Sequence, residues 1–459
     1  MSNCITQYYC CRESDIRVAW RAPFSRRDGF FQFGKDITCY GDYTDGGPTI
    51  AHAGKLHDIE HCVEIDNGTV YLPFDASLVA DNLRREIYVE DHKGRTSSAL
   101  AEIYYCLRPI LPVLIRRRLQ RMYLNGWKAI PFPLWPVDIT VDKLMERLLL
   151  LAIRAGGLER VPFVWFWPDG AQACAVVTHD VETATGRDFC GTLMDVDDSF
   201  GIKASFQLIP EERYHVDEKF LSQIRDRGFE VVVHDLNHDG RLYKSRMQFL
   251  ERAARINSYG REFKAKGFRA GILYRKQIWY DALDFEYDMS VPNAAHLDPQ
   301  RGGCCTVMPY FIGNILELPV TTTQDYTLFN ILNNYSTSLW EQQIQIILEN
   351  HGFMNFIVHP DYVTKKRERQ VFEALLDRLA GLRQRERVWT PTPGEVNRWW
   401  RQRTQMVLVE DAEGWRIEGE GSERAVLAYA SEEGGKLAVR FANHGQKGRR
   451  EFSDTRQHS

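Results

Sequence analysis

Residues 173–182 read ACAVVTHDVE, an apolar run that leads directly into a cluster of titratable side chains. A short apolar run of this kind is typical of a buried strand in a parallel sheet. Further along the chain, FEVVV at 229–233 leads in the same way into HDLNH at 234–238. Because the carboxyl ends of parallel strands meet at one edge, we expect the two polar clusters to lie together.

The middle of the chain repeats this pattern. Short apolar runs alternate with longer amphipathic stretches such as EKFLSQIRDRG and LWEQQIQIILENHG, as in β/α units around a parallel sheet. The apolar runs are ACAVVT (173–178), KASFQLI (203–209), FEVVV (229–233), FRAGIL (268–273), MSVPNA (289–294), ILELPV (315–320), MNFIV (354–358) and RVWT (387–390). Roughly seven or eight such units predict an α/β fold with a closed or partly closed barrel.

Other segments flank the predicted barrel. Before it, β-type runs such as IRVAW and TVYLPF alternate with turns and are followed by helical stretches; after it, strand-like runs resume. The sequence predicts a β-rich N-terminal domain at 1–98, a helical connecting region at 99–161, the barrel at 162–403, a small β appendage at 404–446 and a disordered tail at 447–459.

Composition restricts the class of protein. The chain has 459 residues, of which 44% are hydrophobic, so it can bury a large core. Its net charge of -4 lacks the basic field that nucleic-acid binding requires, so no nucleic-acid partner is expected. No signal-peptide pattern and no apolar stretch of membrane-spanning length occurs, and the ten cysteines lack disulfide-framework spacing. These features favour a cytoplasmic protein. They are compatible with a monomer and with an oligomer.

One basic stretch, LPVLIRRRLQRMY at 111–123, has the composition of a segment that lies on an anionic membrane surface. The alternative is a packed helix with a solvated basic end, which is the usual meaning of a charge run. We favour the packed helix, and membrane contact is not expected.

Several predicted strands end in side chains suited to catalysis. They are His179, Asp180 and Glu182 after the first run, His234 and His238 after FEVVV, Arg269 within FRAGIL, and His359 after MNFIV. Two histidines four residues apart lie on one face of a helical turn, and with one carboxylate they make a ligand set for catalytic Zn²⁺ or a similar divalent ion. Taken alone, the histidine pair is better explained as a surface pair, and the acid pair is equally well explained as a strand-end cap.

The remaining groups suggest a hydrolytic reaction. Of Asp180 and Glu182, one carboxylate can bind the metal while the other takes a proton from water. A buried Arg269 needs a carboxylate partner, and pairing with Asp180 would orient the base. His359, on a distant strand, would protonate a leaving amine.

These motifs, THDVE, HDLNH, FRAGILY, LELPVT and NFIVHP, resemble those of the polysaccharide deacetylase (NodB-homology) family in the same order. The resemblance covers about half the chain, from Pro162 to Trp400, and implies a distorted (β/α)7 barrel that removes N-acetyl or O-acetyl groups from saccharides. It implies the following roles: Asp180 as base, Glu182, His234 and His238 as metal ligands, Arg269 as the brace of the base, and His359 as acid.

The first motif departs from the family pattern, since Asp-Val-Glu-Thr stands where Asp-Asp-Gly-Pro is usual. The metal carboxylate becomes a glutamate one position later, so the roles of Asp180 and Glu182 are interchangeable at this stage. The metal implied is Zn²⁺, with Co²⁺, Ni²⁺ or Mn²⁺ as alternatives. Asp361 and Glu317 are the candidates for the partner of His359.

The leading hypothesis is an N-deacetylase for a saccharide or a nucleotide- or lipid-linked sugar of surface polysaccharide metabolism. RGGCCTVMPYFIGN at 301–314 is long enough to form part of a substrate rim, with its cysteines as buried apolar filling. Three His-Asp pairs, at 179, 234 and 238, also suggest a metal phosphohydrolase. The third hypothesis is a saccharide-binding protein that has lost activity.

Overall fold

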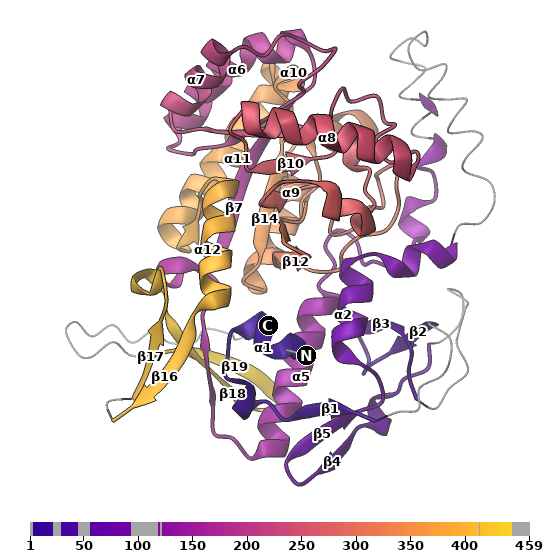
Figure 1. Cartoon of the computed structure of the whole chain (residues 1–459), viewed down its shortest axis with the longest axis vertical. Helices are drawn as coiled ribbons and strands as arrows, with labels where there is room; N and C mark the ends of the chain where they lie inside the picture. The colour runs from indigo at the N-terminus through magenta and orange to yellow at the C-terminus, as the bar shows by residue number, and fades with distance from the viewer. Residues whose placement is uncertain are drawn as a thin grey trace.

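The computed structural model describes residues 3–21, 29–44, 56–92, 118–119, 122–412 and 414–442. In Figure 1 these residues form an upper part that contains β7, β10 and β14, and a lower part that contains both the N-terminal and the last strands. The predicted tail at 447–459 and most of the basic stretch at 111–123 lie outside the described residues. Within the described ranges, no helix has both the length and the apolar character needed to cross a membrane.

The upper part is built on a nine-stranded sheet in which parallel strands follow one another in the order β14-β7-β8-β9-β10-β11-β13. These strands are β7 (Ala173–Val181), β8 (Ser205–Leu208), β9 (Glu230–His234), β10 (Gly267–Arg269), β11 (Tyr287–Asp288), β13 (Ile315–Glu317) and β14 (Phe353–Ile357). Two further strands are β12 (Tyr310–Ile312), antiparallel to β13, and β15 (Val388–Trp389), parallel to β7. The predicted α/β class is confirmed.

Side chains span the gap between the ends of this curled sheet. In the described part of the chain, no backbone ladder joins β13 to β14. Instead, the Thr321 hydroxyl donates to the Phe353 carbonyl at 2.7 Å, and the Thr322 hydroxyl donates to the Asn355 carbonyl at 2.7 Å. Both threonines are buried, so their hydroxyls satisfy carbonyl groups that a neighbouring strand would otherwise bond.

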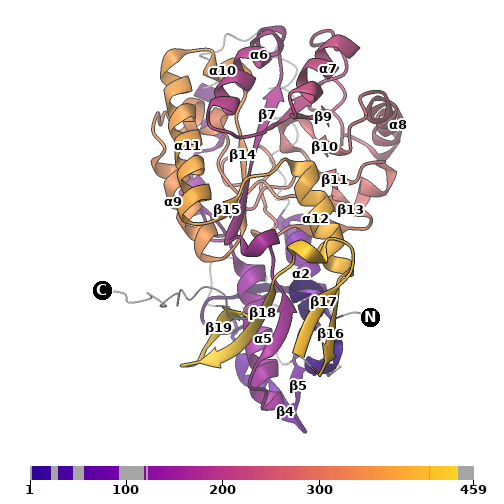
Figure 2. The same ribbon diagram turned by 90° about the vertical axis from the view of Figure 1, so that its left-hand side faces the viewer.

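Helices cover the outer face of the sheet, as Figure 2 shows for α6, α7, α8, α9 and α11. They pack on outward-pointing strand residues such as Val177, Phe206 and Val233. The helices of this part are α6 (Ala184–Ser199), α7 (Glu218–Asp226), α8 (Arg246–Glu262), α9 (Ser338–Glu349), α10 (Pro360–Val363), α11 (Lys366–Arg385) and α12 (Pro393–Gln405).

Two predicted strands differ from the observed ones. MSVPNA forms no strand of its own, because the backbone N–H and the hydroxyl of Ser290 both donate to the Asp288 carboxylate and turn the chain just after β11. FRAGIL contributes only its first two residues to β10. Its remainder is the 3₁₀ turn η6 (Gly271–Leu273), in which Ile272 and Leu273 have positive φ angles of 62° and 54°.

The lower part begins with the N-terminal elements. They are α1 (Cys4–Tyr9), β1 (Val18–Trp20), β2 (Gly29–Gln32), β3 (Thr38–Gly41), β4 (Glu64–Asp66), β5 (Thr69–Leu72), α2 (Ala76–Arg84), η3 (Ile87–His92) and α5 (Thr140–Gly156). The buried carboxylate of Asp142 on α5 joins this part to the barrel. It accepts hydrogen bonds from the hydroxyls of Tyr8, at 3.0 Å, and Thr306, at 2.7 Å.

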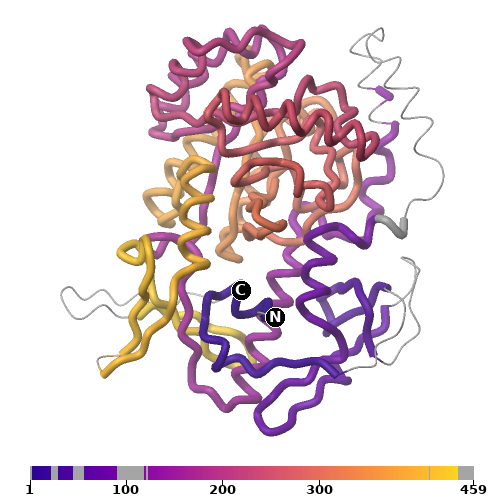
Figure 3. Tube along the Cα trace, in the orientation of Figure 1, coloured from indigo at the N-terminus to yellow at the C-terminus, as the bar shows by residue number. Residues whose placement is uncertain are grey.

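The last strands complete the lower part. They are β16 (Val407–Asp411), β17 (Gly414–Glu418), β18 (Leu427–Glu433) and β19 (Lys436–Phe441). β18 pairs with β6 (Val161–Val164), the strand that precedes the barrel, and Figure 3 shows the indigo and yellow segments close together. The buried Arg403 donates to the carbonyls of Tyr8 and Val164, at 3.0 and 2.9 Å. The two ends of the described chain thus share one core, and the predicted domain boundaries stay predictions.

Candidate active site

The predicted functional side chains come from the carboxyl ends of β7, β9, β10 and β14, in a part of the sheet where neighbouring strands run parallel. Side chains alternate along β7, so Thr178 and Asp180 face the barrel interior while His179 faces outward. The His179 ring lies 3.0 Å from the Val358 carbonyl and 3.0 Å from the Asp197 carboxylate, packed against the helical layer. His179 is therefore a structural residue, apart from the other candidates.

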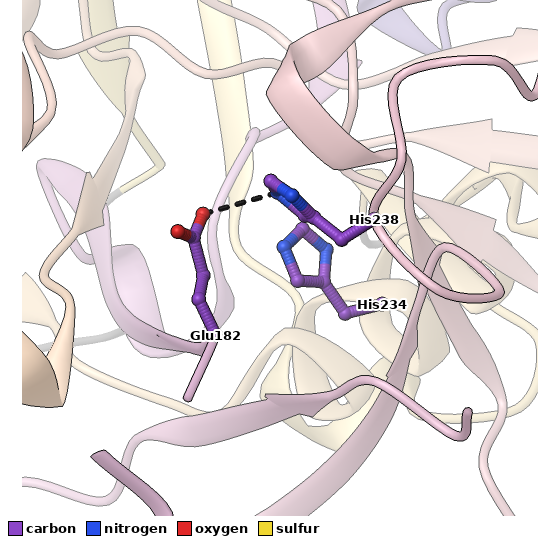
Figure 4. A group of neighbouring side chains, drawn as sticks. All are labelled: Glu182, His234 and His238. Carbon is purple, nitrogen blue, oxygen red and sulfur yellow. Dashed lines mark ion pairs between the residues drawn. The ribbon is translucent and has the colours of Figure 1, made fainter. Parts of the chain in front are cut away.

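Three of the predicted residues converge on one point. Glu182, His234 and His238 each offer a ligand atom, and these atoms lie within 4.8 Å of one another. Figure 4 shows both imidazoles facing the Glu182 carboxylate, whose Oε1 lies 3.0 Å from Nε2 of His238. Nε2 of His234 is buried and has no hydrogen-bond partner among the described residues. Burial lowers the pKa of His234 to about 4, so its imidazole is neutral, as a metal ligand must be.

The two histidines meet through an irregular turn. The expected helical turn is absent, since Asp235 and His238 have positive φ angles of 56° and 55°. Gly271 packs against this turn: a Cβ atom there would lie 2.5 Å from Oδ2 of Asp235 and 2.9 Å from Cδ2 of His238. The glycine of the FRAGIL segment therefore leaves room for the HDLNH turn.

Asp180 is held by Arg269, as predicted from the cost of burying an arginine. Nη1 of Arg269 donates to Oδ1 of Asp180 at 2.6 Å and to the Thr178 hydroxyl at 2.8 Å, and Arg269 is fully buried. The other carboxylate oxygen, Oδ2, lies 3.8 Å from Nε2 of His234. Burial would raise the pKa of Asp180, but Arg269, followed by His234 and His359, lowers it below the usual carboxyl value. Asp180 is thus an oriented carboxylate beside the three-residue cluster.

His359, which follows β14, also borders the cluster. Its Nε2 lies 3.5 Å from Oε1 of Glu182, and its Nδ1 lies 2.6 Å from Oδ1 of Asp325. Asp325 also accepts the backbone N–H of His359 at 2.8 Å. Burial would lower the pKa of His359, but Asp325 and then Glu182 raise it well above the usual histidine value.

The partner of His359 is therefore Asp325, and neither sequence candidate fills that place. Asp361 accepts a hydrogen bond from the Thr183 hydroxyl instead. Glu317 lies on β13, where it accepts the backbone N–H of Val291 at 2.9 Å and neighbours Asp288. Asp325 follows ILELPV in TTTQD, so the rule that functional side chains follow strands, applied over a longer loop, would have found it.

Asp288 and Glu317 form a separate buried carboxyl pair. They are adjacent on β11 and β13, and both are fully buried. Burial raises the pKa of Asp288, and burial together with the Asp288 charge raises that of Glu317 well above the usual carboxyl value. Two carboxylates this close repel each other when both are ionised, which is why the Asp288 charge adds to the rise in the pKa of Glu317.

A cleft opens beside the cluster, with about 760 Å³ of space that is in part open to solvent. Glu182, His238 and His359 line it, so the cluster is accessible to a small molecule. Its other walls are largely apolar and aromatic, as is common for ligand sites. They include Ile272, Leu297, Tyr326 and Tyr362 from the barrel, and Tyr123 and Leu124 from the segment before it.

Comparison with known proteins finds distant likenesses of the barrel. No protein-family model and no curated protein sequence matches the chain. A Mycobacterium smegmatis protein assigned as a polysaccharide deacetylase has 15% identity and a TM-score of 0.43, over 52% of this chain and 93% of its own. The allantoinase Puue has 11% identity and a TM-score of 0.40, over 51% and 92%.

A third similar structure is a mutant of a CE4-family pseudoenzyme with restored enzymatic activity. It has 14% identity and a TM-score of 0.31, over 49% of this chain and 67% of its own. At these identities and TM-scores, the likenesses decide neither the family of the chain nor its activity.

Proposed function

We propose that this protein is a metal-dependent hydrolase that removes an N-acetyl or O-acetyl group from a saccharide. The observation that carries the proposal is the convergence of Glu182, His234 and His238 beside an oriented carboxylate, Asp180, and the imidazole of His359. A carboxylate and an imidazole beside one candidate metal site support the roles of base and acid that we assign to them.

The donor set fits a divalent ion. Two imidazoles and one carboxylate are the ligands of catalytic zinc sites that keep a position open, and Co²⁺, Ni²⁺ or Mn²⁺ can use the same donors. The unpartnered Nε2 of His234 supports this fit, because a buried ring nitrogen normally finds a partner. When bound, such an ion polarises a carbonyl oxygen and makes water a better nucleophile at neutral pH.

Asp180 and Glu182 are assigned different roles. Asp180 is assigned as the base, because Arg269 fixes one of its oxygens and leaves the other facing His234. Glu182 is assigned to the metal, because it contacts the imidazoles of His238 and His359 and its side chain is 26% exposed. Asp180 takes a proton from the attacking water, whose oxygen bonds to the acyl carbon.

His359 completes the reaction. Asp325 engages its Nδ1, so Nε2 is the nitrogen that faces the cluster. As the bond between the acyl carbon and the sugar nitrogen or oxygen breaks, Nε2 gives its proton to the leaving atom. The products are acetate and the free amine or alcohol of the sugar.

The substrate is proposed to be a saccharide or a nucleotide- or lipid-linked sugar of surface polysaccharide metabolism, used in the cytoplasm. The apolar and aromatic walls of the cleft favour a sugar as the substrate, because the C–H faces of a sugar ring pack on such surfaces. Neither competing hypothesis has similar support. The phosphohydrolase hypothesis rested on three His-Asp pairs, and the first of them lies away from the site, because His179 faces outward. The Asp180–Arg269 and His359–Asp325 pairs, which orient a carboxylate and an imidazole beside the cluster, favour an enzyme over an inactive binding protein.

The test combines metal analysis with product release. Purified wild-type protein is expected to bind one Zn²⁺, and His234→Ala is expected to bind none, while the control His57→Ala, on an exposed histidine, binds as wild type. Acetate release is then measured with tetra-N-acetylchitotetraose, UDP-N-acetylglucosamine and 4-nitrophenyl acetate. Absence of metal from the wild type would sink the proposal; hydrolysis of UDP-N-acetylglucosamine to UMP and N-acetylglucosamine 1-phosphate without acetate would favour a phosphohydrolase.

A further inference from the structure

The cleft is not built by the barrel alone. Tyr123 and Leu124, which precede the barrel in the chain, line it together with Leu297 and Pro299 of a barrel loop. The Tyr123 hydroxyl lies 3.4 Å from the Pro299 carbonyl, so the two walls touch. The segment before the barrel therefore borders the place where a substrate would lie.

The barrel side of the cleft includes a loop with an unfavourable backbone conformation. Ile272 lines the cleft with a φ angle of 62°, and the next residue, Leu273, has a φ angle of 54°. Positive φ is unfavourable for a β-branched residue, and such positions persist only where surrounding contacts hold them. Something must therefore fix this loop.

Arg275 is the residue that holds it. Its Nη1 donates to the Leu273 carbonyl at 3.0 Å, and its backbone N–H and carbonyl bond to the Gln300 amide, both at 3.0 Å. Nη2 also approaches the Arg301 carbonyl at 3.4 Å. One buried arginine thus connects the Ile272 loop to the loop that carries Leu297 and Pro299.

The charge of Arg275 is balanced from outside the barrel. Nε of Arg275 donates to Oε2 of Glu86 at 2.7 Å, and Nη2 donates to Oε1 of the same carboxylate. Glu86 lies between α2 and η3 of the N-terminal region, and both side chains are buried. At Gly302 a Cβ atom would lie 2.5 Å from Oε1 of Glu86, so the glycine of the RGG segment gives this carboxylate room. Paired planar groups of this kind give a fixed geometry.

We propose that Glu86 is a positioning residue for the substrate cleft: through Arg275 it fixes the two barrel loops that face Tyr123. The N-terminal region then forms part of the site for the portion of the saccharide remote from the acetyl group. This inference rests on the proposed function. It predicts that the reacting groups stay intact without Glu86, while binding of an extended substrate weakens.

The test compares a long and a short substrate in Glu86→Gln, which keeps the shape and removes the charge. For tetra-N-acetylchitotetraose we expect KM to rise about tenfold with kcat nearly unchanged, because uniform binding is lost. For 4-nitrophenyl acetate, which is too small to need the walls, kcat/KM should stay as in wild type, as should zinc content. Glu86→Asp should restore part of the loss, and Glu341→Gln, in an ion pair on α9, is the matched control.

Two further measurements keep the proposal testable. Tyr123→Ala changes a side chain that is 52% exposed, so the fold should survive, and KM for the tetrasaccharide should rise as in Glu86→Gln. Hydrogen exchange in 270–275 and 296–303 should quicken in Glu86→Gln, and this readout needs no substrate. Equal losses on both substrates, or unchanged KM and unchanged exchange, would overturn the proposal. If the wild type hydrolyses neither substrate, the proposed function fails. Faster hydrogen exchange in Glu86→Gln would still show that Glu86 fixes the two loops through Arg275.

Discussion

Asp325 offers the sharpest test of the proposed mechanism, because only its contact with His359 makes it functional. Asp325→Asn keeps the shape of the side chain and removes its charge. The contact from Nδ1 of His359 to Oδ1 of Asp325 is 2.6 Å long, and both side chains are buried. A hydrogen bond to a charged group contributes about 1.5–3 kcal/mol, so losing the charge should lower kcat/KM for an amide substrate by about 10- to 100-fold.

The type of substrate distinguishes a defect in the acid from general damage. Deacetylation of tetra-N-acetylchitotetraose releases an amine, which needs a proton from His359, whereas 4-nitrophenolate leaves an ester without one. Asp325→Asn should therefore lose much more activity on the saccharide than on 4-nitrophenyl acetate. Because Asp325 raises the pKa of His359, its neutralisation lowers that pKa and should move the alkaline limb of the kcat/KM profile to lower pH.

Two variants serve as controls for this prediction. Asp361→Asn changes the sequence candidate that bonds to Thr183, and should leave the alkaline limb in place. Asp377→Asn changes an exposed carboxylate on α11 and should behave as wild type. Equal losses of activity on both substrates in Asp325→Asn would refute the role assigned to Asp325, as would an alkaline limb that moves further in Asp361→Asn than in Asp325→Asn.

Three other perturbations test the surroundings of the site. Arg269→Met leaves the buried Asp180 carboxylate unpaired and should lower the free energy of unfolding in urea by about 3–5 kcal/mol. Gly271→Ala pushes a methyl group against Asp235, and chelator competition should show zinc affinity lowered by about tenfold or more, with unchanged far-UV dichroism. Burial raises the pKa of Glu317 in the folded state above its pKa in the unfolded chain. The contribution of Glu317 to the free energy of unfolding is therefore complete below the unfolded pKa and is lost as pH rises through the folded pKa. Glu317→Gln should reduce this loss, which is at most about 1.4 kcal/mol per pH unit, in urea denaturation between pH 5 and pH 8.

Local patterns in the chain were enough to predict the parallel sheet and the position of the candidate site. Strand formation depends on runs such as ACAVVT, and parallel strands bring the residues that follow them to one edge. Asp180, Glu182, His234, His238, Arg269 and His359 therefore reach the same end of the barrel in the structure, as their places in the sequence indicated. Because side chains alternate along β7, His179 points away from these residues, although it directly precedes Asp180 in the sequence.

The tertiary structure decided the partners of these residues. Asp325 reaches His359 from a loop between β13 and α9. Glu86 reaches Arg275 from the N-terminal region, which the sequence predicts to be a separate domain. The hydroxyls of Thr321 and Thr322, which follow β13, donate to backbone carbonyls of β14. The physical reason is common to all three: strand and helix periodicity is set by neighbours in the chain, whereas a buried charge or carbonyl is satisfied by whichever group the fold brings within hydrogen-bond distance.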